Sequence, residues 1–210
     1  MINVRDDHYP NGTVQALMQT DNVTANTRNV LQNRIDRKYK IEPEFFDAEI
    51  FQILRAVCMR LIPQINPDRM VDLAGCLDGI LAEGKGNGWR YDAMPEDGKA
   101  FMTGLYGIDK SAVLKYQKNF HLLTANEQDL ILASVQSGEA TGLTWDILPA
   151  KLFFEELLAA LVELYYSHPF AKEDIGEVAM ADAKGWQKIG LNQLEAYEPK
   201  IVKAELYATP

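Results

Sequence analysis

The sequence has few residues of the kinds that usually build a catalytic site or a cross-linked scaffold. Its 210 residues include two cysteines, Cys58 and Cys76, and three histidines. No Cys-x-x-Cys-His motif occurs, which excludes a c-type haem attached to this chain. Both cysteines fall in apolar helical patterns, so we expect two buried free thiols. A disulfide within the chain or between subunits is the alternative in an oxidising compartment.

Basic charge and long hydrophobic runs are also scarce. The chain has 21 Lys and Arg against 30 Asp and Glu, a net charge of −9. This balance argues against a nucleic-acid binder, because such proteins neutralise phosphates with a basic face. No window approaches the roughly 18 apolar residues that span a bilayer, so we expect no membrane span. Residues 1–10 lack an apolar core and predict neither a signal peptide nor a twin-arginine leader.

The alternation of apolar and polar residues that is typical of strands is missing as well. Apolar residues instead recur at helical spacing, and the sequence predicts an all-α fold: a single domain of five to seven helices around one core. We divide the chain into an N-terminal arm (1–40), a helical domain (41–191) and a polar C-terminal tail (192–210). The arm carries six basic and four acidic residues, a charge of +2, and we expect it to be extended apart from a short helix near residues 27–35.

Local capping signals predict where the helices of the domain begin and end. Pro43 suits a first helical position, and Thr124 with Glu127 forms a capping box whose helix ends at Gly138. Asp109 and Thr144 are expected N-caps. The predicted helices cover residues 43–62, 67–81, 110–120, 124–136 and 145–167. The last of these is apolar over most of its circumference, which is typical of a helix that is central to a fold or shared with a partner.

The candidate chemical groups do not form a familiar catalytic motif. The sequence lacks Glu-x-x-His and His-Glu-x-x-His, the signatures of di-iron bundles and of zinc proteases. We interpret His8 as solvated and His121 as a capping or core residue. His168 is expected to cap the end of the long helix, where Pro169 stops it. The glycines at 84, 86 and 88 lack phosphate-loop and dinucleotide spacing and predict a flexible loop. We therefore predict no catalytic, cofactor-binding or metal-binding residue.

Several stretches resemble a known family when they are taken together. They are FQILRAVCMRLIPQ (51–64), FMTGLYGID (101–109), FHLLTANEQDLILASVQSGE (120–139), FFEELLAALVELYYSHP (153–169), the Ile-Gly that ends at Gly176, and KGWQKIGL (184–191). The combination of Tyr-Tyr-Ser-His-Pro with a later Gly-Trp is the most specific part. Over residues of about 45–191 the chain resembles the gluconate 2-dehydrogenase subunit 3 family.

The resemblance implies a non-catalytic small subunit of a bacterial FAD-dependent sugar or polyol dehydrogenase complex. Its catalytic partner would resemble the glucose–methanol–choline (GMC) oxidoreductases and hold the FAD, and a cytochrome c subunit would take the electrons. The small subunit would support folding, flavin loading, stability or export of the large one. Family members commonly carry a twin-arginine leader, so the resemblance implies a periplasmic complex; the lack of a leader here leaves a cytoplasmic location open.

The aromatic end of the long helix is the candidate partner interface. Tyr165, Tyr166, His168, Pro169 and Trp186 are the residues we assign to it, because aromatic side chains often anchor interfaces. Packing within the chain and helix capping are the alternative roles of the same residues. An alternative function is a stand-alone helical enzyme or ligand-binding protein, in which His121, His168 and acidic residues would converge.

Overall fold

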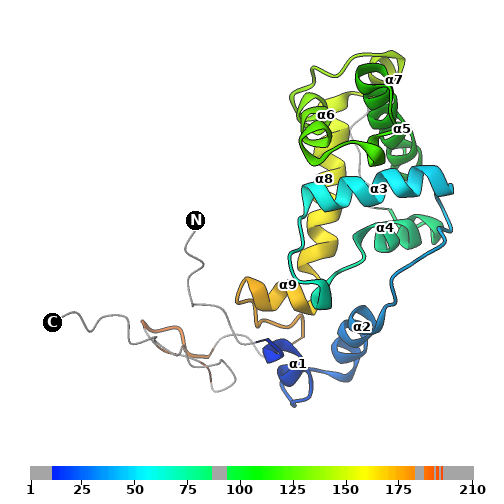
Figure 1. Ribbon diagram of the computed structural model, residues 1–210. Helices are drawn as coiled ribbons and strands as arrows, with labels where there is room; N and C mark the ends of the chain where they lie inside the picture. The colour runs from blue at the N-terminus through cyan, green and yellow to red at the C-terminus, as the bar shows by residue number, and fades with distance from the viewer. Residues whose placement is uncertain (1–10, 87–93, 183–186, 192, 194, 196–210) are drawn as a thin grey trace. The chain divides into compact units, whose positions relative to one another are not determined.

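A computed structural model describes residues 11–86, 94–182, 187–191, 193 and 195 of the chain (Figure 1). Within these residues the structure contains helices and no strand, which confirms the all-α prediction. The α-helices are α1 (Thr13–Met18), α2 (Ala25–Asp36), α3 (Ala48–Leu61), α4 (Leu73–Ala82), α5 (Asp97–Tyr116), α6 (Ala125–Ser137), α7 (Leu143–Ile147), α8 (Ala150–Tyr166) and α9 (Pro169–Asp174), with short 3₁₀ helices η1 (Pro67–Arg69) and η2 (Phe120–Leu122).

The chain forms two compact units. One consists of residues 38–165, and the other combines the residues up to 37 with those from 166 onward. We call them the central unit and the two-ends unit. The described part of the predicted arm is more helical than the sequence suggested, because it holds α1 as well as the expected helix near residues 27–35, which is α2.

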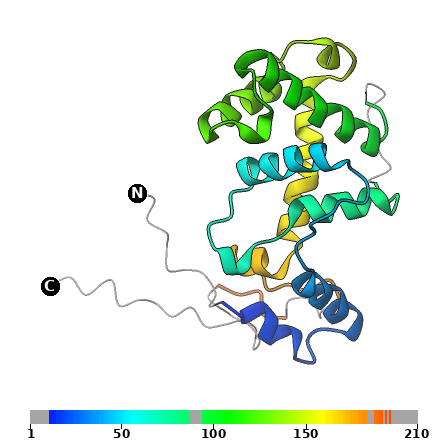
Figure 2. The ribbon, with the colours of Figure 1, turned by 45° about the vertical axis from the view of Figure 1, so that its right-hand side comes forward.

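The core of the central unit takes buried side chains from α3, α4, α5, α6 and α8. Phe153, Leu157 and Leu161 of this helix are fully buried and belong to one apolar cluster with residues of α3, α4, α5 and α6. Figure 2 shows α3 and α4 crossing α8 one after the other along its length. Burial of this many large apolar side chains is the main source of stability for such a unit. The apolar helix α8 thus contributes one buried face to this core, and its sharing with a partner stays a prediction.

Two of the predicted helix ends are confirmed in detail. The Thr124 side chain accepts a hydrogen bond from the backbone N–H of Glu127, and the Glu127 carboxylate accepts one from the backbone N–H of Thr124 at 2.8 Å. Gly138 ends α6 in the left-handed conformation, with φ of 78°. These signals are local, so they operate independently of the tertiary packing.

Other predicted boundaries are wrong, for three identifiable reasons. Asp109 does not start a helix, because α5 continues through it and its buried carboxylate accepts the backbone N–H of Phe120 at 2.8 Å. The predicted helix from Pro43 begins five residues later, at Ala48, where Asp47 caps it. The predicted helix that Thr144 should start is divided at Pro149 into α7 and α8, because proline lacks the N–H that a continuous helix needs.

A buried carboxylate, Asp78, holds the chain that leads into α3. It lies in the apolar helix α4, and its Oδ1 accepts the backbone N–H groups of Phe45 and Phe46, each at 3.0 Å. Its Oδ2 accepts the backbone N–H of Glu44 at 2.8 Å and lies 2.7 Å from Lys40 Nζ. This carboxylate thus accepts the backbone N–H groups of residues 44–46, which lie outside the helix.

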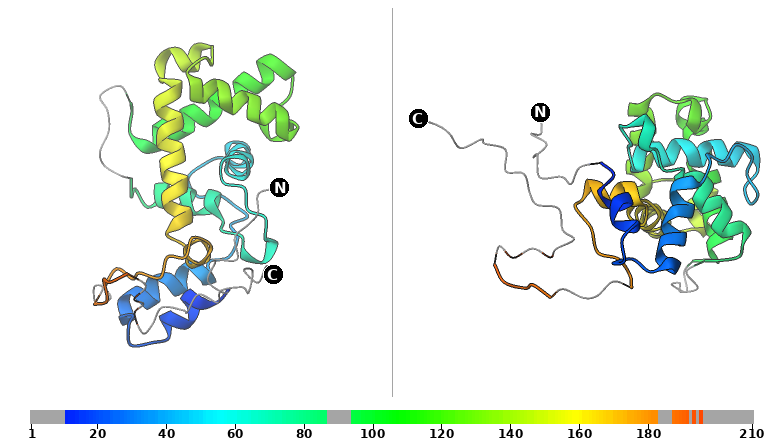
Figure 3. Two further views of the ribbon diagram at one scale, coloured as in Figure 1. Left: turned by 90° about the vertical axis from the view of Figure 1, so that its left-hand side faces the viewer. Right: turned by 90° about the horizontal axis from the view of Figure 1, so that it is seen from below.

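The two-ends unit has its own small core. Val14 and Met18 of α1 pack with Leu31 of α2, and Met180 covers them from the C-terminal part of the chain. Figure 3 shows α1 and α2 beside α9 in this unit. Glu173 of α9 is buried, and its carboxylate accepts the backbone N–H groups of Gly12 at 3.0 Å and Val14 at 2.8 Å. The Glu173 side chain of α9 therefore accepts hydrogen bonds from backbone N–H groups at the start of α1. In most helices an N-cap side chain close in sequence does this.

The structure also shows the state of the two cysteines. Cys58 and Cys76 are both free thiols; Cys58 is buried and Cys76 is partly buried. Burial raises the pKa of the Cys58 thiol, with the nearby Asp72 carboxylate as a second cause, so this group stays protonated and unreactive.

None of the helices in the described ranges is both long and apolar enough to cross a bilayer.

Candidate partner-binding site

The segment Tyr165–Pro169 forms the joint between α8 and α9. Its conformation changes at His168, which is extended (φ −83°, ψ 139°), and Pro169 occupies the first position of α9. The Nδ1 atom of His168 accepts a hydrogen bond from the backbone N–H of Phe170 at 3.2 Å. His168 therefore caps the start of α9, which corrects the prediction that it caps the end of the preceding helix.

The same joint is fastened to α2. The Nε2 atom of His168 lies 3.1 Å from the carbonyl oxygen of Arg34, to which it can only donate. In return, Nη1 of Arg34 donates to the carbonyl oxygen of Ser167 at 2.5 Å. In this arrangement Nδ1 of His168 accepts and Nε2 donates. Two reciprocal hydrogen bonds, separated by more than 130 positions along the chain, hold α2 against the start of α9.

The predicted interface residues differ in how accessible they are. His168 is 6% exposed and Pro169 is also buried. Tyr165 is partly buried and packs on the core of the central unit, whereas Tyr166 is 43% exposed. Trp186 lies outside the described residues. The buried residues have contacts within the chain that account for them, and the role of this set in partner binding stays a prediction.

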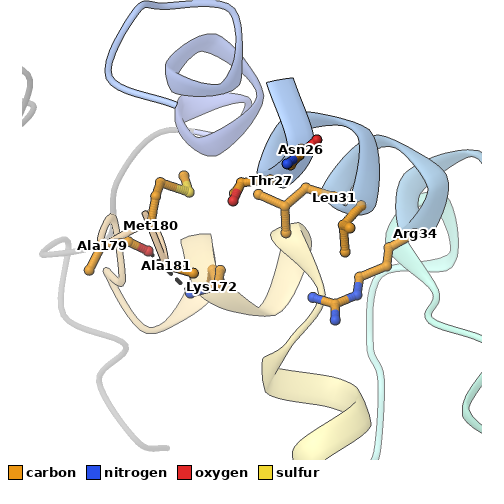
Figure 4. A pocket seen from close by; sticks show the side chains of 9 residues that line it. Asn26, Thr27, Leu31, Arg34, Lys172, Ala179, Met180 and Ala181 are labelled. Atoms are coloured by element: carbon orange, nitrogen blue, oxygen red, sulfur yellow. Dashed lines mark hydrogen bonds between the residues drawn. The ribbon is translucent and has the colours of Figure 1, made fainter. Parts of the chain in front are cut away.

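A hollow of about 330 Å³ lies beside this joint in the two-ends unit. We call it the α2–α9 hollow. Figure 4 shows α2 on one side of it, and Lys172 of α9 with the segment 179–181 on the other. Its walls are mostly apolar, and two cationic side chains stand among them. The lining residues are Asn26, Thr27, Val30, Leu31, Arg34, Lys172, Ala179, Met180 and Ala181.

Sequence reasoning found one wall of this hollow and missed the other. The helix predicted near residues 27–35 is α2, which forms one wall of the hollow. In the structure Leu31 is buried and Ile35 is partly buried, while Val30 is 51% exposed at the hollow. Lys172 and Met180 carried no signal, because only the tertiary fold brings them next to α2.

The comparison with protein families identifies the chain. The family model described as gluconate 2-dehydrogenase subunit 3 matches residues 48–192, which is more than half of the sequence. The chain belongs to the gluconate 2-dehydrogenase subunit 3 family. The resemblance that the motifs indicated over residues of about 45–191 is thereby confirmed, and membership of a family of subunits implies a multi-subunit complex. Comparisons with curated proteins and with solved structures gave no match.

The match covers the α8–α9 joint completely and the α2–α9 hollow only in part. Residues 48–192 include the α8–α9 joint, Lys172 and the segment 179–181. They do not include α2, which supplies Val30, Arg34 and the rest of the second wall. The wall formed by α2 thus belongs to the part of this chain that precedes the family region.

His121 is the other histidine within the described part of the chain. His121 lies in η2, and its Nδ1 atom is buried with no hydrogen-bond partner. Across the described residues, no group of three or more His, Cys, Asp or Glu side chains is placed to hold a metal ion. His8 lies outside the described residues.

Proposed function

We propose that this chain is the non-catalytic small subunit of a bacterial FAD-dependent sugar or polyol dehydrogenase complex. In this complex the chain supports the folding, flavin loading, stability or export of a GMC-type catalytic subunit. The observation that carries the proposal is the family match over residues 48–192. The FAD resides in the partner, and a cytochrome c subunit accepts the electrons. The family resemblance favours a periplasmic complex.

Exposed apolar side chains on the central unit support a role in assembly. Leu143 and Ile147 stand four residues apart on the short helix α7 and are almost fully exposed, while Trp145 between them is anchored by a hydrogen bond from its Nε1 to Ser111 Oγ at 3.0 Å. Leu114 on α5 is exposed as well. Leu143 and Ile147 share one face of α7, and an exposed apolar face is characteristic of protein–protein interfaces.

Co-expression with the flavoprotein encoded beside this chain tests the proposal. We expect the two proteins to elute together in size exclusion, with flavin absorbance in the shared peak. Omitting this chain should leave the flavoprotein aggregated or without flavin. A flavoprotein that folds and loads its flavin equally well without this chain, and never co-elutes with it, would contradict the proposal.

A further inference from the structure

The α2–α9 hollow has a charge pattern that differs from that of the chain as a whole. The sequence carries a net charge of −9, yet the described residues that line the hollow include two cations and no carboxylate. Lys172 Nζ contacts the Ala179 carbonyl oxygen at 3.4 Å, and Arg34 Nη1 contacts the Ser167 carbonyl oxygen. Both cations are thus held in place at the hollow by backbone carbonyl groups.

The floor of the hollow between these cations is apolar. Leu31 and Met180 belong to the small core of the two-ends unit, and Ala179 and Ala181 add further carbon surface. A group that fills this space must combine an apolar part with a negative charge. Such a group would gain hydrophobic contact on the floor and ion pairs at Lys172 and Arg34.

The hollow is open, which favours a protein segment over an enclosed small molecule. Val30, on its wall, keeps 51% of its surface exposed. Pockets for small ligands usually bury about 70–90% of the ligand. An open apolar hollow with charges beside it is instead the geometry in which an anchoring side chain of a partner protein is bound.

We propose that the α2–α9 hollow binds an acidic segment of the catalytic flavoprotein subunit. This segment places an apolar side chain against Val30, Leu31 and Met180 and a carboxylate against Lys172 and Arg34. The inference rests on the proposed function and adds the location and the chemistry of one contact. It assigns a role in partner binding to α2, which lies outside the family region.

Substitutions at Val30 and Lys172 test this inference in the full chain. Val30→Glu fills the hollow and repels an acidic segment, and Val30→Lys fills it without that repulsion. Lys172→Gln removes one positive charge. Ile65→Glu is the matched control, since Ile65 is 96% exposed and lies in the central unit. The measurement is the Kd of each variant for the purified holo-flavoprotein encoded beside the chain, with the melting temperature of each free variant recorded.

We expect Val30→Glu to raise the Kd by about tenfold or more and Val30→Lys to raise it less. Ile65→Glu should stay within about twofold of the wild type. Raising the salt from about 50 to about 300 mM should weaken wild-type binding, and it should weaken binding of Lys172→Gln by a smaller factor.

Two kinds of failure can be told apart. If the wild-type chain does not bind the flavoprotein, the proposed function itself is wrong. If the wild type binds and Val30→Glu binds equally well, the function stands and the inference about the hollow is overturned. Saturable binding of dodecanoate by the free chain, lost in Val30→Glu without any change in flavoprotein binding, would assign the hollow to a small amphiphile and overturn the inference as well.

Discussion

Asp78 shows how a single carboxylate can be ionised inside an apolar helix. Burial opposes its charge, but the Lys40 side chain and the backbone N–H groups of Glu44, Phe46 and Phe45 hold its pKa below the ordinary value of an aspartate. Burial also opposes the charge of Lys40. The Asp78 and Glu44 carboxylates outweigh this effect and raise the pKa of the Lys40 ammonium group. The pair is therefore charged across the neutral pH range.

Replacing Asp78 by Asn should destabilise the protein strongly. One carboxylate oxygen becomes an NH₂ group, which cannot accept from the backbone N–H groups or from Lys40, so buried donors lose their partner. We expect a loss of about 2–4 kcal/mol in the free energy of unfolding, measured by urea denaturation. Asp129→Asn is the control, because Asp129 pairs with Arg60 on the surface, and it should leave the free energy of unfolding nearly unchanged. Equal losses in both variants would contradict this account.

The lowered pKa of Asp78 also predicts how stability depends on pH. A carboxyl group with a lower pKa in the folded state stabilises the protein above its unfolded pKa of about 3.9, and this contribution is lost as the pH falls through the folded value. The free energy of unfolding should therefore fall between pH 5 and pH 3 more steeply in the wild type than in Asp78→Asn. Parallel pH profiles for the two proteins would show that other groups dominate acid unfolding.

At the scale of helices, close packing between α5 and α8 depends on Gly104. A Cβ atom at this position would lie 2.1 Å from Cε2 of Phe153, which is fully buried on α8. At Gly79 in α4, by contrast, a Cβ atom would meet nothing closer than Lys40 Nζ at 3.9 Å. The same substitution should thus have opposite effects at the two glycines.

We expect Gly104→Ala to lower the free energy of unfolding by about 1–3 kcal/mol, because Phe153 must move within a packed core. Gly79→Ala should raise it by about 0.5–1 kcal/mol, because alanine favours the helix and restricts the unfolded chain. Urea unfolding of both variants beside the wild type measures the difference. The interpretation fails if Gly104→Ala is neutral or stabilising.

The helix boundaries show which signals a sequence carries by itself. Thr124 and Gly138 were predicted correctly, because each acts on backbone groups within a few residues. Asp109 looks like an N-cap in the sequence, yet it serves the backbone of Phe120 eleven residues later. An aspartate in a helical pattern can cap locally or bind a distant amide, and only the tertiary fold decides between these roles.

At the scale of the whole molecule, both ends of the chain build one unit. Glu173 supplies the contact that fixes the start of α1, so Glu173→Gln should loosen this unit selectively, since an amide NH₂ cannot accept from Gly12 or Val14. Amide hydrogens of residues 13–36 should exchange roughly tenfold faster or more, while those of α5 and α8 stay unchanged, as measured by hydrogen-exchange mass spectrometry. Exposed Glu155→Gln serves as the control, and faster exchange in both units would contradict this selectivity.

The candidate site could be predicted only in part, because its contacts join residues that are far apart in the sequence. The motif that ends in His168-Pro169 led to the correct family, and α2 was predicted from its apolar spacing. The hydrogen bonds that join Arg34 to Ser167 and His168 link residues about 133 positions apart, and no local pattern indicates such pairs. The α2–α9 hollow lies between α2 and residues 172–181, which are also far apart in the sequence, so it is visible only in the folded chain.

The distance along the chain between Gly12 and Glu173 has a consequence for synthesis on the ribosome. The two residues are 161 positions apart, and at about 5–20 residues per second the carboxylate is made roughly 8–32 s after the amide that it binds. During that time the newly made N-terminal segment has no α9 to pack against, whereas residues 38–165 can begin to condense as they emerge. A protease or a chaperone that acts on nascent chains would therefore meet this protein first through residues 11–37.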